Sequence, residues 1–337
     1  MTDHRPTSED HGWRKDSFAS AEVFAQFWWA IPTCILIGAA VILPAVRYAK
    51  TTSGRQVVAY CAQDQVYAEP IFLSFEKETG IKVRAVFDSE AVKTVGLANR
   101  LLAERSHPQC DLFWGNEELR TRQLAARQTF RDTNGWATLG YRSRRVVINT
   151  NLMSADTAPR SLLELTNTSW RGRVALAYPQ FGTTAAHLHA LRQLWGERLW
   201  EAWCRGLAAN QPFLVDGNSV VVKLVGKGDA WVGLTDSDDV ADGQREGLPI
   251  VALPMSDETL LIPNTVALVR EGPHPQAAEI LFDYLQRPGT VQRLVAANAL
   301  EGSTPSDPRL PTLRVNWAAL FADLDGTTKE LNQIFLR

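Results

Sequence analysis

Strand and helix patterns alternate along the chain from residue 56 onward. Short apolar runs bounded by polar residues predict strands, and longer segments with helical periodicity predict helices. The first helix is expected to stop at Gly80, since glycine readily takes the left-handed conformation found at helix ends. The predicted order is strand 56–62, helix 67–80, strand 81–87, helix 89–105 and strand 110–115. This βαβαβ order implies a parallel sheet covered by helices on both faces.

A second α/β unit begins near residue 142. Its later elements are predicted as strand 172–179, one long helix 183–207, strand 211–217, helix 219–229 and strand 230–236. Strand 258–269 then returns towards the first unit, and helix 273–288 packs on it. Two lobes joined by crossover strands leave a cleft between them. We expect lobe 1 to comprise residues 55–145 and 262–337, and lobe 2 to comprise residues 146–261.

The stretch from Val23 to Val46 contains no charged residue and is long enough to cross a bilayer. It is longer than the apolar core of a usual signal peptide, and no convincing small-residue cleavage site follows it. We therefore expect a transmembrane anchor over residues 23–50, behind an N-terminal cytoplasmic tail of residues 1–22. A processed signal peptide is the alternative.

Composition narrows the class of function. The 337 residues carry a net charge of −2, so nucleic acid is not an expected partner. The four cysteines include no CxxC pair, which predicts neither a zinc site nor a disulfide framework. The motifs GxSxG and HExxH and the P-loop are absent from the sequence. The chain is therefore expected to bind a ligand rather than to catalyse a reaction, and no cofactor is predicted.

Polar residues follow the predicted strands, at the edge where ligands bind in open α/β sheets. Three helix starts, at Asp88, Gly182 and Gly217, carry small or hydroxyl residues, and the free backbone N–H groups there suit an anion. N-capping alone is the alternative explanation for each helix start. The candidates are Asp64, Ser89, Glu90, Asn116 and Glu117 in the first unit, and Gly182, Thr183, Thr184, Asn218 and Ser219 in the second.

The segment GLTDSDD, residues 233–239, places three carboxylates at the end of an apolar strand. Oxygen-rich sets of this kind favour hard cations. The candidate metal ligands are Asp64, Glu117, Asp236 and Asp238. A solvated turn carboxylate remains the alternative for each of these residues. A cleft lined with both donors and carboxylates suits a ligand with both charges, or a metal ion held together with an anion.

Five segments between about residues 55 and 305 resemble the bacterial extracellular solute-binding proteins (family 1) of ABC importers, in their ferric-iron-binding branch. The segments are 57–118, 161–184, 216–239, 260–269 and 273–288. The resemblance implies a type II periplasmic-binding-protein fold, with two α/β lobes that close on a small ligand. It also implies delivery to an ABC permease with its ATPase, at the periplasmic face of the inner membrane.

The sequence departs from the iron binders at the ligand positions that the resemblance points to. Asp64 stands where those proteins place a histidine, and their carboxylate after the third strand falls at Asn116 or Glu117. Their two adjacent tyrosines fall at about Ser237 and Asp238. Despite these differences, the resemblance implies a ferric ion with a synergistic anion as one candidate ligand. A small organic solute such as an aminophosphonate, thiamine or a polyamine is the alternative, and an enzyme or a membrane-coupled sensor on the same fold is a further one.

Overall fold

The computed structural model describes residues 56–88, 93–132, 135–303 and 311–336. The predicted anchor and the cytoplasmic tail before it lie outside these residues. Within the described residues, no helix combines the length and the apolar character that crossing a membrane requires.

The first lobe is a parallel α/β layer built around β1. Apolar side chains of β1 are buried on both faces, as expected for a strand inside a parallel sheet. The strand pairs in parallel with β2 on one side and with β3 on the other. The elements are β1 (Gln56–Cys61), α3 (Gln65–Thr79), β2 (Lys82–Val86), α4 (Lys93–Ala103), β3 (Leu112–Gly115), α5 (Glu118–Ala126), α10 (Pro275–Leu285) and α11 (Pro288–Ala296).

The second lobe repeats this scheme around β5, which pairs in parallel with β6 and β7. One predicted helix, 183–207, is in fact two, because Gly196 at φ 74° ends the first and precedes the second. The elements are η1 (Leu162–Thr166), η2 (Thr168–Trp170), β5 (Val174–Ala177), α6 (Gly182–Trp195), α7 (Glu197–Ala209), β6 (Phe213–Val215), α8 (Asn218–Lys227), β7 (Val232–Asp236), α9 (Ser237–Arg245) and β8 (Ile250–Ala252).

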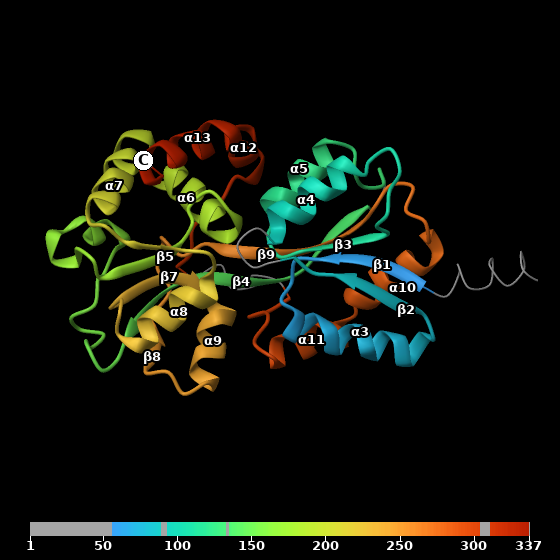
Figure 1. Cartoon of the computed structure of the whole chain (residues 1–337), viewed down its shortest axis with the longest axis horizontal. Helices are drawn as coiled ribbons and strands as arrows, with labels where there is room; N and C mark the ends of the chain where they lie inside the picture. The colour runs from blue at the N-terminus through green and yellow to red at the C-terminus, as the bar shows by residue number, and fades with distance from the viewer. Residues whose placement is uncertain (1–55, 89–92, 133–134, 304–310, 337) are drawn as a thin grey trace, which may run out of the picture. The chain divides into compact units, whose positions relative to one another are not determined.

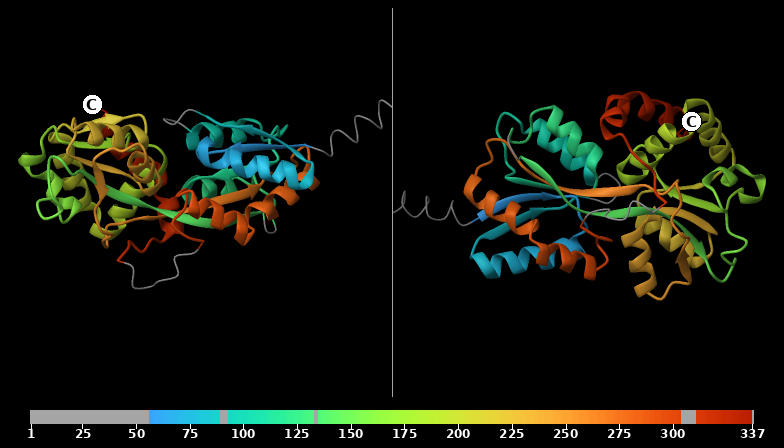
Figure 2. Two further views of the ribbon diagram at one scale, coloured as in Figure 1. Left: turned by 90° about the horizontal axis from the view of Figure 1, so that it is seen from below. Right: turned by 180° about the vertical axis from the view of Figure 1, so that it is seen from behind.

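Two long antiparallel strands connect the lobes, β4 (Trp136–Asn149) and β9 (Leu261–Leu268). The first half of β4 pairs with β9, and its second half pairs with β7 and β8. The described strands thus form one sheet in the order β2-β1-β3-β9-β4-β7-β5-β6, with β8 on β4. Figures 1 and 2 show β4 and β9 running from one lobe into the other. The predicted α/β class and its crossover strands are confirmed.

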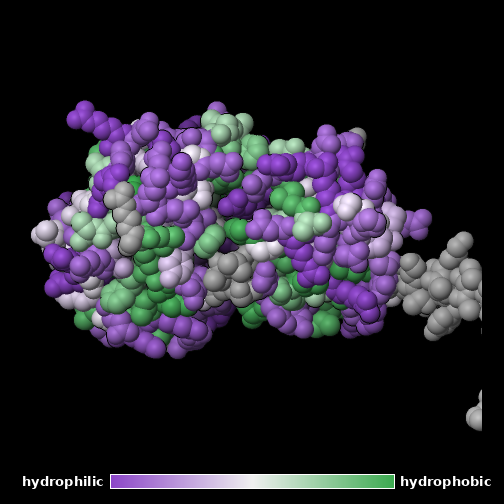
Figure 3. Space-filling model, turned by 45° about the horizontal axis from the view of Figure 1, so that its top comes forward, coloured by the Kyte–Doolittle hydropathy of each residue, from purple (hydrophilic) through white to green (hydrophobic). Residues whose placement is uncertain are grey.

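Helices cover both faces of the sheet in each lobe, and each face has its own apolar core. The helices α12 (Trp317–Ala322) and α13 (Leu324–Phe335) place Leu320, Leu331 and Phe335 in the same core as Trp200 and Trp203 of α7. The prediction that all of 262–337 belongs to lobe 1 is therefore wrong for this C-terminal part. Its apolar residues pack on α6 and α7 of the second lobe, and α12 also packs against α5 of the first lobe, whose Leu119 lies in the same core. The surface seen in Figure 3 is largely hydrophilic and dips between the two lobes.

Candidate functional site

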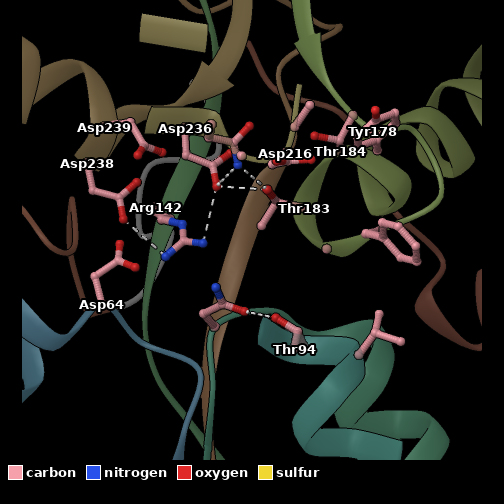
Figure 4. A pocket seen from close by; sticks show the side chains of 17 residues that line it. Asp64, Thr94, Arg142, Tyr178, Thr183, Thr184, Asp216, Asp236, Asp238 and Asp239 are labelled. Carbon is pink, nitrogen blue, oxygen red and sulfur yellow. Dashed lines mark hydrogen bonds and ion pairs between the residues drawn. The ribbon is translucent and has the colours of Figure 1, made fainter. Parts of the chain in front are cut away.

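A small pocket of about 60 Å³ lies where the carboxyl ends of strands from both lobes meet. The second lobe supplies most of its wall, from the end of β7, the start of α9 and the first turns of α6 and α8. The first lobe contributes Asp64, Thr94, Val95 and Asn116, and the connecting strand β4 contributes Arg142. Figure 4 shows Asp64, Thr94 and Arg142 reaching the pocket from separate elements.

Three carboxylates form the acidic side of the pocket. Asp236 ends β7 and precedes α9, while Asp238 and Asp239 lie in the first turn of α9. Each of the three offers an oxygen, and these oxygens all lie within 4.8 Å of one another. Asp236 and Asp238 are buried, and no described residue gives Asp238 Oδ1 a hydrogen bond. This oxygen is a buried, unpartnered acceptor of a residue that lines the pocket.

Two arginines of β4 hold the carboxylates together. Arg142 and Arg144 are two residues apart and so lie on the same face of the strand. Arg144 Nη1 lies 2.6 Å from Asp236 Oδ1, and its Nη2 donates to the Leu234 carbonyl at 3.0 Å. Arg142 lies 3.2 Å from both Asp236 and Asp238, through Nη2 and Nη1 respectively. Both arginine side chains are buried, so these ion pairs are screened little by water.

Asp236 is saturated by further donors. Thr183 Oγ1 donates to Asp236 Oδ2 at 2.8 Å, and Asn218 Nδ2 donates to the same oxygen at 3.2 Å. Burial alone raises the pKa of Asp236, but the charges of Arg144 and Arg142 outweigh it and hold the pKa below the usual range. Asp236 is therefore ionised and ties together the ends of β7, α6 and α8.

The pKa values of Asp238 and Asp239 are shifted upward, in contrast to that of Asp236. Burial raises the pKa of Asp238 to about 7, with repulsion from Asp236 and Asp64 adding to the effect and Arg142 opposing it. Burial and the neighbouring carboxylates, Asp238 first, raise the pKa of Asp239 well above its usual range. A bound cation lowers such pKa values, because it favours the charged form of each carboxylate. The start of α9 is thus suited to receive positive charge.

Two helix N-termini face the same pocket from the second lobe. Gly182 begins α6 at φ 54°, and Gly217 is the N-cap of α8. Neither helix has a side-chain hydrogen bond to its first turn from its N-cap residue. Backbone N–H groups at such ends, with the helix dipole behind them, favour an anion. The pocket therefore combines an acidic side with two helix ends whose dipoles favour an anion.

A contact on the outer part of α9 bridges the lobes beside the pocket. Tyr67 of α3 donates a hydrogen bond to Asp242 Oδ1 at 2.7 Å. Arg245 donates from Nη2 to the Tyr67 hydroxyl and from Nη1 to the Ala297 carbonyl, both at 3.1 Å, and it also pairs with Asp242. Since Asp238 and Asp239 occupy the first turn of the same helix, α9 carries both the acidic side of the pocket and this interlobe contact.

The family model described as bacterial extracellular solute-binding protein matches residues 57–297, most of the chain. This chain belongs to that family. The predicted family membership is thereby confirmed, and the family is one of binding proteins rather than enzymes.

Individual relatives and structures agree with this assignment. An Fe(3+)-binding periplasmic protein of Serratia marcescens is 30% identical over 60% of this chain, and the chain matches 62% of that protein, less than two thirds of its length. Iron-bound HitA from Pseudomonas aeruginosa superimposes with a TM-score of 0.73 at 18% identity, covering 82% of this chain and 99% of HitA.

A third protein has a similar fold but a different bound ligand. AfuA from Actinobacillus pleuropneumoniae, with exogenous fructose-6-phosphate bound, superimposes with a TM-score of 0.71 at 16% identity. The superposition covers 83% of this chain and 98% of AfuA. At these identities, HitA and AfuA show the shared solute-binding fold alone.

The pocket of this solute-binding protein brings together most of the described candidates from the sequence. It contains Asp64, Asn116, Gly182, Thr183, Thr184, Asn218, Asp236 and Asp238. Ser219 is not among the residues that line it, and Ser89 and Glu90 lie outside the described residues. The roles of the pocket residues in binding remain predictions.

The prediction that Glu117 is a ligand of the pocket is wrong, because its carboxylate caps α5 and Glu117 does not line the pocket. Its Oε2 accepts from the Leu119 N–H at 2.5 Å, and its Oε1 accepts from the Arg120 N–H at 2.9 Å. Burial nonetheless raises the pKa of Glu117 to about 7. A polar residue directly after a strand can serve either purpose, and here the helix start uses it.

Sequence reasoning missed Arg142, which reaches the pocket from the middle of β4. The signal was present as arginines alternating with other residues at the start of an apolar strand, Arg142 and Arg144 in RSRRVVIN. Such charges are usually exposed, and only buried partners about ninety residues later in the chain explain them.

Proposed function

We propose that this protein is the solute receptor of an ABC-type import system and that it captures a hard cation together with an anion in the interlobe pocket. The buried, unpartnered Oδ1 of Asp238 within the three-carboxylate cluster is the observation that carries the proposal. A cation there gives the oxygen a partner and offsets the repulsion that raises the carboxyl pKa values.

Ferric iron is the first candidate for that cation. Carboxylate oxygens are hard ligands, and the Serratia relative is named as an Fe(3+)-binding protein. In this proposal Asp238 and Asp239 coordinate the metal, and Asp64 adds a contact from the first lobe. The accompanying anion binds at the starts of α6 and α8, near Thr184 and Gly217.

Capture follows from the placement of these groups on different lobes. Solute binds first to the carboxylates and helix ends of the second lobe, and the first lobe then closes with Asp64, Thr94 and Asn116. The closed form is favoured by the extra contacts that only it provides. The receptor would present this form to a membrane permease at the periplasmic face, held there by the segment 23–50 as an anchor.

A small organic solute carrying phosphate is the second candidate. The saturation of Asp236 by two arginines leaves fewer ligands for a metal than three free carboxylates would. AfuA, with fructose-6-phosphate bound, shares the fold. In this case the phosphate occupies the helix ends, and amino or hydroxyl groups donate to Asp238 and Asp239.

Thermal unfolding of the full-length protein separates the two candidates. Ferric citrate at about a hundred times its dissociation constant should add roughly 2.7 kcal/mol of stability, reversed by a chelator, while citrate alone should not. Fructose 6-phosphate, 2-aminoethylphosphonate, thiamine and spermidine form the organic series. If only a member of the organic series stabilises the protein, the solute is organic and not ferric iron. If none of these probes stabilises it, both proposed solute classes are contradicted.

A further inference from the structure

A second and larger cavity, of about 320 Å³, lies in the second lobe apart from the interlobe pocket. Its walls come from Arg144–Val146 of β4, from the loop that leads into η1 and from the loop between β8 and β9. Cavities of this size hold small organic molecules, whereas the interlobe pocket of about 60 Å³ suits a more compact solute.

Hydrogen bonds between its two loops hold this cavity in shape. Glu258 accepts from the Ser161 hydroxyl and from the Leu162 N–H, both at 2.7 Å. His187 of α6 donates from Nε2 to the Glu258 carbonyl at 2.8 Å, and Arg145 donates to the Leu253 carbonyl at 3.1 Å. The cavity is therefore preformed, because the loops that enclose it are tied to each other and to β4.

Positive charge dominates the polar part of the wall. Arg144, Arg145 and Arg160 line the cavity, and its carboxylate, Glu258, already accepts two hydrogen bonds. Because Asp236 balances the charge of Arg144, the positive charge of the wall comes from Arg145 and Arg160. Burial lowers the pKa of His187 to about 3, with Arg144 acting in the same direction, so the ring is neutral and the charge comes from the arginines. An anionic group is the ligand that such a wall attracts.

Arg144 also presents a buried donor without an acceptor. Its side chain is 1% exposed, and no described residue accepts a hydrogen bond from its Nε. Arg144 lines this cavity and is absent from the wall of the interlobe pocket. The cavity wall therefore includes a residue with an unpaired buried donor, although its Nη1 and Nη2 groups are committed to Asp236 and Leu234.

The rest of the wall is apolar. Pro159, Leu253 and Met255 line it together with Ala158 and Val146. We propose that this cavity is a second binding site, separate from the interlobe pocket, for a small organic carboxylate with an apolar body. The carboxylate pairs with Arg145, which already donates to the Leu253 carbonyl of the cavity loop, and the apolar body packs against the side chains of Leu253 and Met255. This assignment goes beyond the proposed solute receptor function and does not depend on it.

The test uses 3-phenylpropionate and its neutral amide, 3-phenylpropionamide, as probes in calorimetric titrations of the full-length protein. The site predicts saturable binding of the carboxylate and much weaker binding of the amide. Arg145→Gln should weaken carboxylate binding about tenfold, since it removes a charged partner. Arg198→Gln, an equal charge change at an exposed residue of α7, should leave the binding unchanged.

A cavity-filling variant locates the probe. Met255→Trp should abolish carboxylate binding, and the unfolding midpoints of all variants are measured to confirm that each is folded. Equal binding of acid and amide, an absence of carboxylate binding, or retention of full affinity in either Arg145→Gln or folded Met255→Trp would overturn the proposal.

Discussion

Arg142 Nη1 lies 3.2 Å from Asp238 Oδ2, so a buried charge on a strand that connects the lobes pairs with a carboxylate of the pocket. In the proposed function, a cationic solute at Asp238 would compete with this ion pair. Solute capture would thereby be linked to β4, which continues into both lobes of the sheet. Asp236 has a structural role instead, because it pairs with both Arg142 and Arg144 and the two arginines are buried.

The two aspartates are therefore expected to respond differently to neutralisation. Asp236→Asn leaves Arg144 without a carboxylate and should destabilise the protein by about 3–5 kcal/mol. Asp238→Asn leaves Arg142 paired with Asp236 and should cost much less stability, while it weakens cation binding about tenfold or more. Urea unfolding and ligand titration of both variants measure these effects. Equal destabilisation by the two changes would refute the division of roles.

The pKa of Asp238 predicts how stability depends on pH. Its pKa rises from 3.8 to about 7 on folding, so between these values the folded protein binds more protons than the unfolded chain. The free energy of unfolding without solute should therefore fall as pH rises from about 4 to 7. Glu117 contributes in the same direction, since burial also raises its pKa to about 7.

Comparison with Asp238→Asn isolates the contribution of Asp238, because the variant keeps Glu117. Urea unfolding of both proteins at about pH 5 and pH 8 should show a larger loss of stability for the wild type. Parallel pH profiles for the two proteins would be inconsistent with a raised pKa at Asp238.

Glu117 should affect stability without affecting binding. Glu117→Ala removes the cap of α5 and is expected to cost about 0.5–2 kcal/mol, while solute affinity stays unchanged. Thermal unfolding and solute titration of the same sample measure the two properties. A large loss of affinity would return Glu117 to the set of ligands.

The interlobe contact of Tyr67 predicts an effect on the rate of solute release. Tyr67→Phe removes the hydroxyl that joins Asp242 and Arg245 to the first lobe, and solute dissociation should become several-fold faster, on the order of one lost hydrogen bond. Tyr284→Phe is the matched control, because the Tyr284 hydroxyl bonds Glu78 within the first lobe. Stopped-flow measurement of solute release into excess chelator should show faster release from Tyr67→Phe than from Tyr284→Phe. Identical release rates for the two variants would exclude a role for the contact in closure.

The sequence predicted the order of most strands along the chain and the starts of α6 and α8 well, because both depend on local patterns. Thr183 and Thr184 could be placed in the pocket because the starts of helices that follow parallel strands gather at one edge of the sheet. The roles of Asp236 and Glu117 could not be separated in this way. Each is an acidic residue at or just beyond the end of a strand, and the difference arises from Arg144 and from the start of α5.

Arg142 shows a second limit of local pattern. Its burial depends on Asp236 and Asp238, which lie more than ninety positions away in the sequence. The same holds for α12 and α13, whose apolar stripe has no local sign of the lobe on which it packs. Long-range pairing decides both cases.

Iron content after loading tests the central claim most directly. Full-length wild type, Glu117→Ala and the double variant Asp238→Asn/Asp239→Asn are incubated with ferric citrate, dialysed and assayed for bound iron. The account predicts one iron per chain in the wild type and in Glu117→Ala, and almost none in the double variant. Absence of iron from the wild type, or equal loading of the double variant, would contradict cation capture by the carboxylates of α9.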